Sequence, residues 1–251
     1  MNNELEKKEN SEVAAYNPNV IYGFEETKSE DIIIPRIKVI NALSPERTEG
    51  IAQEGDIINS LTKESVIGKR FIPIKQYYSN MHWNSDRNAE NRILCRSLDG
   101  RIGNTEDGAI SCAQCKKNQF DNTKKGKDSY PTCTAYINFL GFFDDEPMPV
   151  VLSFAKTNYN EGRKMLSIAR SLRVSLWKYA YSLVSKKVSK DRNIWYIVVP
   201  NLAGSTTPEQ QALAFELYKI YNDTTIDTNY EDTTQNTSAG AFDAQTENEI
   251  G

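Results

Sequence analysis

The sequence predicts a mainly β protein, a small β-barrel or sandwich with two or three helices, an inserted four-cysteine metal subdomain and disordered acidic ends. Three observations lead to this prediction. Short segments rich in β-branched and aromatic residues recur along the chain, while helical periodicity is clear in only two places. All four cysteines fall within 39 residues. The acidic residues are concentrated at the two ends of the chain.

The strands are predicted from short apolar runs bounded by turn residues. Residues 32–40 begin the ordered part, and Pro35 confines this segment to a sheet edge or a strand entry, because proline cannot donate to a ladder. The polar turns at 144–147 and 187–192 predict two hairpins. The further strands are expected at 55–61, 71–78, 92–97, 134–144, 148–154, 177–186 and 194–199.

Two helices interrupt these strands. The first is expected to open at Asn160, with Met165, Ile168, Ala169 and Leu172 as its apolar stripe. The second has stronger end signals, since Thr207 can cap the helix, Pro208 occupies its first position and Gln210 completes a capping box.

The cysteines are spaced Cys-x16-Cys-x2-Cys-x17-Cys, at Cys95, Cys112, Cys115 and Cys133. Four thiolates complete a closed tetrahedral zinc site, so the predicted metal holds structure and performs no chemistry. Two disulfides are the competing interpretation, but no secretory leader precedes the chain and a reducing cytosol favours zinc. A redox Cys-x-x-Cys pair is less favoured. His82 lies thirteen residues before Cys95 and is not needed as a ligand.

The net charge of −4 is unevenly distributed. Residues 1–31 carry a net −5 and residues 222–251 a net −7, which leaves a net +8 for residues 32–221. These ranges are the expected flexible N-terminal segment, the folded domain and the disordered C-terminal tail. A basic body favours a polyanionic partner. No apolar run approaches membrane-spanning length, so no membrane partner is expected and the protein should be intracellular.

Catalysis is poorly supported by the sequence. There is a single histidine and no phosphate-binding loop, nucleophile elbow or His-Glu-x-x-His motif. We therefore expect a protein that is not an enzyme.

Basic and aromatic side chains on the predicted strands instead indicate binding of a single nucleic-acid strand, in which cations follow phosphates and bases stack on rings. Tyr77 and Trp83 share strand parity, as do Trp177, Tyr179 and Tyr181. Aromatic residues at period two form the core face of a barrel equally often, and this alternative stays open. The candidate contacts are Lys75, Tyr77, Trp83, Lys156, Arg163, Arg170, Arg173, Trp177, Tyr179, Tyr181, Lys186, Lys187, Lys190 and Arg192.

Several segments resemble small zinc-containing phage and prophage proteins that are regarded as single-stranded DNA-binding proteins. The resemblance spans roughly residues 32–200 and includes Ile33 to Lys38, Ala42 to Glu46, Cys112 to Cys115 and Val151 to Lys156. It implies an oligonucleotide/oligosaccharide-binding (OB) barrel that carries a zinc ribbon, here at residues 92–135. It also implies a setting in DNA replication or recombination, in the cytoplasm of a bacterial host.

The expected function is therefore sequence-tolerant binding of single-stranded DNA, with structural zinc and an acidic tail that recruits replication or recombination proteins. A zinc-ribbon adaptor that binds a replication or transcription complex by protein contacts is the main alternative. A metallo-nuclease would need a carboxylate cluster that the sequence does not place.

Overall fold

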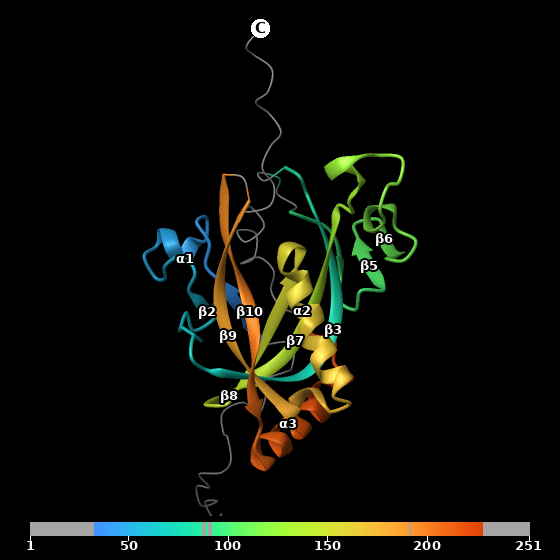
Figure 1. Ribbon diagram of the computed structural model, residues 1–251. Coiled ribbons are helices and arrows are strands. Elements are labelled where there is room, and N and C mark those ends of the chain that lie inside the picture. The colour runs from blue at the N-terminus through green and yellow to red at the C-terminus, as the bar shows by residue number, and fades with distance from the viewer. Residues whose placement is uncertain (1–32, 87–88, 90–91, 191, 228–251) are drawn as a thin grey trace, which may run out of the picture. The chain divides into compact units, whose positions relative to one another are not determined.

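The computed structural model describes residues 33–86, 89, 92–190 and 192–227 (Figure 1). The predicted disordered ends fall almost entirely outside these residues. The strands are β1 (Arg36–Val39), β2 (Ile57–Asn59), β3 (Arg70–Trp83), β4 (Ile93–Ser97), β5 (Ile102–Thr105), β6 (Gly108–Ser111), β7 (Cys133–Phe143), β8 (Glu146–Ala155), β9 (Tyr179–Lys190) and β10 (Asn193–Ser205). The α-helices are α1 (Pro45–Thr48), α2 (Tyr159–Ser171) and α3 (Pro208–Tyr221).

The strands form one open mixed sheet in the order β2-β1-β8-β7-β3-β4-β5-β6. β9 pairs with both β3 and β10, so the β9–β10 ribbon branches from the start of β3. β1 pairs with β8 in parallel, and the other pairs are antiparallel. The prediction of a mainly β protein with two or three helices is confirmed. The OB-like closure is not confirmed by this strand order and stays a prediction.

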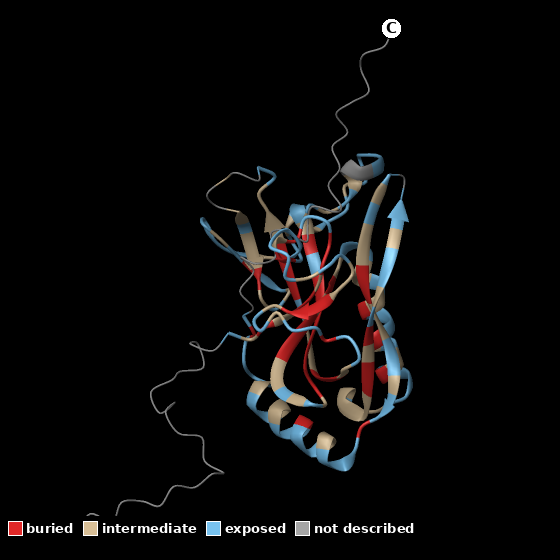
Figure 2. Ribbon diagram, turned by 90° about the vertical axis from the view of Figure 1, so that its left-hand side faces the viewer, coloured by how far each residue is buried: buried red, intermediate tan, exposed pale blue. Residues whose placement is uncertain are grey.

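Apolar residues of the central strands face both sides of the sheet, and a helix covers each side. Phe71 packs in one core cluster with Met165 of α2, whereas its neighbour Ile72 packs in a second cluster with Ala214 of α3. Strands buried on both faces need continuous apolar runs, which explains segments such as Phe71 to Ile74. Figure 2 shows the buried residues concentrated in these strands.

β3 and β7 form the longest pairing in the centre of the sheet, from Phe71↔Phe143 to His82↔Cys133. The register shifts between Pro73 and Lys75, opposite Gly141. A Cβ atom on Gly141 would lie 2.4 Å from the carbonyl oxygen of Ile72 and 2.5 Å from the Phe71 ring. The two strands therefore lie so close together at this point that only a residue without a Cβ atom fits at position 141.

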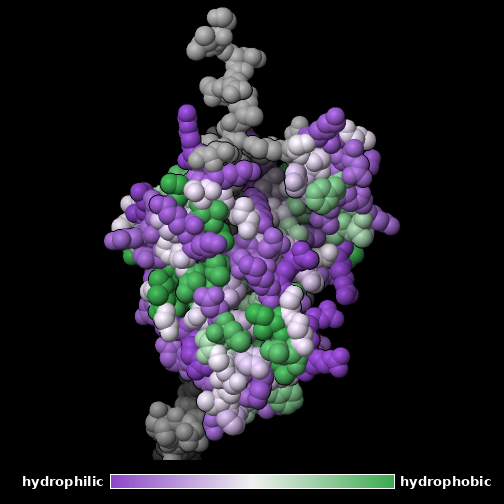
Figure 3. All heavy atoms as spheres, in the orientation of Figure 1, coloured by the Kyte–Doolittle hydropathy of each residue, from purple (hydrophilic) through white to green (hydrophobic). Residues whose placement is uncertain are grey.

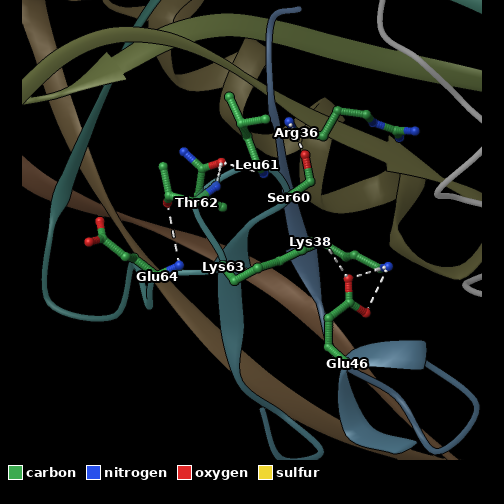
Figure 4. A network of polar contacts seen from close by, with 9 residues as sticks. Arg36, Lys38, Glu46, Ser60, Leu61, Thr62, Lys63 and Glu64 are labelled. Atoms are coloured by element: carbon green, nitrogen blue, oxygen red, sulfur yellow. Dashed lines mark hydrogen bonds and ion pairs between the residues drawn. The ribbon is translucent and has the colours of Figure 1, made fainter. Parts of the chain in front are cut away.

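A buried ion pair joins β1 to α1 (Figure 4). The Lys38 Nζ lies 3.0 Å from Oε1 and 2.9 Å from Oε2 of Glu46, and both side chains are 3% exposed. Lys63 adds a second cation, 3.2 Å from Glu46 Oε1. Burial acts to raise the pKa of Glu46, but the Lys38 and Lys63 contacts hold it below its usual value.

The hairpins and both long helices lie where the sequence predicts them. The β7–β8 and β9–β10 hairpins are formed, although the second turn is shorter than expected because β9 continues to Lys190. The capping box of α3 is present, with the Thr207 hydroxyl accepting from the Gln210 backbone N–H. Helix α2 begins at Tyr159 with Asn158 at its N-cap position, so the predicted cap Asn160 lies inside the first turn.

Two features were missed by the sequence analysis, α1 and the β5–β6 hairpin inside the cysteine-rich segment. The Arg96↔Asn104 pairing joins this hairpin to β4. Both elements consist of four-residue segments with little apolar content, which gives no periodic signal.

The chain remains packed beyond the predicted domain boundary at residue 221. The Lys75 ammonium donates to the carbonyl oxygens of Tyr221, Asn222 and Thr224, and so caps the end of α3. Ile226 is 4% exposed within the second core cluster, and Asp227 forms an ion pair with Arg96. None of the described helices combines the length and the apolar character that crossing a membrane requires.

Candidate nucleic-acid interface

A groove of about 360 Å³ lies between α2 and the central strands. Two tyrosines and two arginines contribute to it, and no acidic side chain of the described residues lines it. In the orientation of Figure 1, Figure 3 shows hydrophilic side chains gathered over the middle of this face. The lining residues are Tyr78, Ile137, Tyr159, Arg163, Leu166, Ser167, Arg170 and Ser171.

The groove follows from the periodicity of α2. Met165 and Ala169 are buried against the sheet, while Arg163 and Arg170 lie seven residues apart on one exposed flank. Gly162 brings the helix close to β8, since a Cβ atom there would lie 2.9 Å from the Cβ of Phe154. The close packing of α2 leaves its basic flank at the edge of the groove.

Among the described residues, no ion pair neutralises the two arginines of the groove. Within the described residues neither Arg163 nor Arg170 takes part in an ion pair, whereas the neighbouring Lys164 pairs with Glu161 at 2.7 Å. Burial raises the pKa of Tyr159, so its phenol remains a neutral hydrogen-bond donor at physiological pH. Tyr78 is 47% exposed and presents an accessible ring. Such an arrangement can bind an anion and stack on a planar group.

Among the predicted contacts, the structure brings only Arg163 and Arg170 into this groove. Lys156, Arg173, Lys186, Lys187, Lys190 and Arg192 are exposed but line other surfaces. The last four lie toward the free end of the β9–β10 ribbon. Lys75 is occupied as the cap of α3, and burial lowers its pKa.

The predicted aromatic contacts are used mainly in packing. Tyr181 is 1% exposed in the first core cluster, so its ring is not available to a base and this part of the prediction is wrong. Trp177 lies against Tyr218 of α3, with ring centroids 5.4 Å apart, and Tyr77 joins the same cluster. Tyr179 packs on the first cluster and Trp83 on a third one around Met81. A period-two aromatic pattern is compatible with both a core face and a stacking surface. In this structure these rings pack in the core clusters.

Tyr78 and Tyr159, the two tyrosines of the groove, were not among the predicted contacts. Tyr78 alternates with the half-buried Tyr77 on β3, so strand parity would have selected it once the packed face was known. Tyr159 lies at the first position of α2, four residues before Arg163. That spacing places both side chains on one helix face.

The four cysteines surround one cavity of about 170 Å³ next to this groove. Cys95 comes from β4, Cys112 and Cys115 from the segment after β6, and Cys133 from the start of β7. All four are free thiols. Gly103 leaves room for them, because a Cβ atom there would lie 2.6 Å from the Cys95 sulfur and 3.7 Å from the Cys112 sulfur.

The electrostatics of the cavity disfavour isolated thiolates. Burial, followed by the charges of the other three cysteines, raises the pKa of Cys133 to about 12. Burial also raises the pKa of Cys95. A bound cation would reverse this balance by stabilising the thiolates. The described side chains include no group of three or more His, Cys, Asp and Glu already arranged to hold an ion, although the four cysteines line the same cavity.

One face of β3 connects the groove to the cysteine cavity. Tyr78 lines the groove, whereas Asn80 and His82 line the cavity, and the three residues alternate along the strand. The Asn80 side-chain amide donates to the Gly100 carbonyl oxygen at 3.4 Å. Burial, with a smaller effect of Lys117, lowers the pKa of His82, so its imidazole is neutral at physiological pH.

Comparison with known proteins gives one family. The family model described as "Pam3 phage gp34-like protein" matches residues 6–227, which include every element and site residue described above. No curated protein and no solved structure matches the chain.

Proposed function

We propose that this chain, which belongs to the Pam3 phage gp34-like protein family, binds single-stranded DNA without sequence preference in the groove beside α2. The observation that carries the proposal is the convergence of Tyr78, Tyr159, Arg163 and Arg170 on one groove without an acidic side chain. Aromatic faces and unpaired cations are the two requirements for holding an unpaired strand.

The size of the groove supports a single strand over a duplex. A volume of about 360 Å³ is in the range of small-ligand pockets, so it would hold only a short part of a strand. The remainder of the strand would follow other exposed cations, among which Lys186, Lys187 and Lys190 of the ribbon are candidates. A duplex presents its bases inside the helix, where Tyr78 could not stack on them.

A second part of the proposal is a structural zinc ion bound by Cys95, Cys112, Cys115 and Cys133. The donor set supports it, since four free thiols from three parts of the chain line one cavity. Such an ion would supply the ordering energy that the β5–β6 hairpin and the following loop lack in apolar contacts. It would thereby hold the cysteine-rich wall beside the groove.

The DNA proposal predicts a specific loss of affinity when both groove arginines are removed. We expect Arg163→Ala with Arg170→Ala to weaken binding of oligo-dT about 10-fold and to reduce the slope of log affinity against log salt by about 1.4, because each phosphate contact on a single strand contributes about 0.7. Fluorescence quenching titrations of the full chain at several salt concentrations measure both quantities.

A matched control removes the same two positive charges outside the groove. Lys164→Ala lies within α2 and Arg173→Ala two residues after its end, and neither residue lines the groove. We expect this variant to bind nearly as the wild type does. Equal losses in the two double variants would refute the groove as the binding site, and an affinity independent of salt would refute DNA binding itself.

The metal proposal predicts one zinc per chain in protein purified without chelator. We expect Cys112→Ser to lower the zinc content and to expose residues 93–133 to hydrogen exchange, because the subdomain loses its ordering ligand. Elemental analysis and exchange mass spectrometry measure the two effects, with Ser111→Ala as the neighbouring control. A zinc-free wild-type chain with the same exchange pattern as Cys112→Ser would contradict the proposal.

The setting that we propose is DNA replication or recombination in a phage-infected bacterial cytoplasm, with the acidic tail as a contact for partner proteins. Residues 228–251 of that tail lie outside the described residues. The adaptor function is the alternative, and unchanged fluorescence on addition of oligo-dT would favour it.

A further inference from the structure

We propose that His82 stabilises the metal centre from outside its ligand set, by donating an imidazole N–H hydrogen bond to a metal-bound cysteine sulfur. This inference rests on the zinc site proposed above. It assigns a function to the only histidine in the chain.

The strand pairing places His82 between two of the cysteines. It is the direct partner of Cys95 in β4 on one side and of Cys133 in β7 on the other. Residues directly opposite in an antiparallel pair point to the same face, with Cβ atoms about 4.5–5.5 Å apart. The imidazole therefore projects between the two cysteine side chains, and it lines the same cavity.

A bulge in β4 lies immediately beside this arrangement. His82 pairs with Cys95 and the next residue, Trp83, pairs with Ile93, so Leu94 has no partner in β3. Bulges re-aim side chains and bend a strand locally. This one turns β4 at the point where Cys95 enters the cavity.

The charge of the centre creates the need for such a donor. Four thiolates around one Zn²⁺ carry a net charge of −2, and burial of that charge is unfavourable unless hydrogen-bond donors surround the sulfurs. The cavity contains four residues with side-chain N–H groups. Asn80 already donates to Gly100 and Asn118 to the Cys112 carbonyl oxygen.

His82 and Lys117 also line the cavity, and neither side chain donates a hydrogen bond to another group of the described residues. Among the described residues, the His82 imidazole makes no hydrogen bond to another protein group. Lys117 extends from an exposed loop position, whereas His82 is half-buried on the central strand. The geometry thus assigns the fixed contact to His82. The four sulfurs already complete a tetrahedral zinc site, so the imidazole is placed outside the ligand set.

The test is a metal titration of the full chain and three variants at the neighbouring strands. Cobalt(II) reports the ligand set through its visible spectrum, and competition with zinc gives the affinity. We expect wild-type protein to bind one cobalt with a four-thiolate spectrum. His82→Ala should weaken zinc binding roughly 10- to 100-fold, as loss of an outer-shell partner does, without changing that spectrum.

Two further variants separate the hydrogen bond from packing. His82→Gln keeps an N–H donor and should recover most of the affinity. Leu94→Ala shortens another side chain of the cavity that has no donor and should bind zinc as the wild type does.

The outcomes distinguish this inference from its premise. Equal affinities for His82→Ala and wild type would overturn the role of His82, while the zinc site would stand. A changed cobalt spectrum in His82→Ala would also overturn it, because the imidazole would then be a ligand. A wild-type chain that binds no cobalt or zinc would overturn the proposed metal site itself.

Discussion

Replacing Glu46 with alanine should destabilise the folded protein by about 3–5 kcal/mol, the usual effect of removing one partner from a buried ion pair. The variant removes the carboxylate whose two oxygens the Lys38 ammonium contacts at 3.0 and 2.9 Å, in a site where the Lys38 side chain is only 3% exposed. Denaturant unfolding at neutral pH, followed by tryptophan fluorescence, measures the change.

Two controls show whether burial is the cause. Glu54→Ala breaks an exposed ion pair, in which the Arg47 side chain is 48% exposed and the Glu54 side chain 32%. We expect it to lower the free energy of unfolding by at most about 1 kcal/mol. The double variant Lys38→Met with Glu46→Leu removes both charges and should recover much of the loss. A Glu46→Ala effect no larger than that of Glu54→Ala would contradict the interpretation.

The same ion pair predicts how stability depends on pH. Because the pKa of Glu46 is lower in the folded chain than in the unfolded chain, its contribution is complete above the unfolded value. The contribution is lost as the pH falls through the lowered pKa. As the pH falls, the free energy of unfolding of the wild type should therefore decrease more than that of the Lys38→Met, Glu46→Leu variant. A difference that does not change with pH would be inconsistent with a lowered pKa.

Gly141→Ala should destabilise the protein by about 3 kcal/mol, the upper end of the range for overpacking a core. The new methyl group would lie 2.4 Å from the Ile72 carbonyl oxygen and 2.5 Å from the Phe71 ring. A backbone oxygen within the β3–β7 ladder cannot move away without breaking the pairing that organises both core clusters. Calorimetry or denaturant unfolding measures the loss.

Gly162→Ala is the matched comparison for this prediction. Its methyl group would lie 2.9 Å from the Cβ of Phe154, a longer contact than the 2.4 Å approach at residue 141, and alanine favours a helix over glycine by up to about 1 kcal/mol. We expect a clearly smaller loss than for Gly141→Ala. If the two variants unfold alike, close backbone approach is not what requires glycine at residue 141.

Local structure was largely predictable from this sequence. The capping box of α3 and the β7–β8 hairpin depend on neighbouring residues, and both are present. The length of β9 and the presence of β5 and β6 were not predictable. These strands are ordered by pairing with other strands, β9 with β10 and β5 with β4, and their own residues carry little apolar signal.

The candidate site was predictable in part. The spacing of the cysteines identified a common site, and the structure places all four around one cavity. Helical periodicity predicts that Arg163, Arg170 and Arg173 share a basic flank, but only the first two border the groove, because α2 ends at Ser171. The aromatic contacts were not predictable, since Tyr77 and Tyr78 carry the same side chain and only one of them faces outward.

The sequence by itself determined the mainly β composition, the capped start of α3, the grouping of the four cysteines and the basic character of residues 32–221. The tertiary structure alone decided which side chains are accessible. The physical reason is that strand parity assigns side chains to two faces, and both faces of this sheet are partly covered, one by α2 and the other by α3. Only where that cover ends does a ring such as Tyr78 reach the surface, and only strand pairing brings His82 between Cys95 and Cys133.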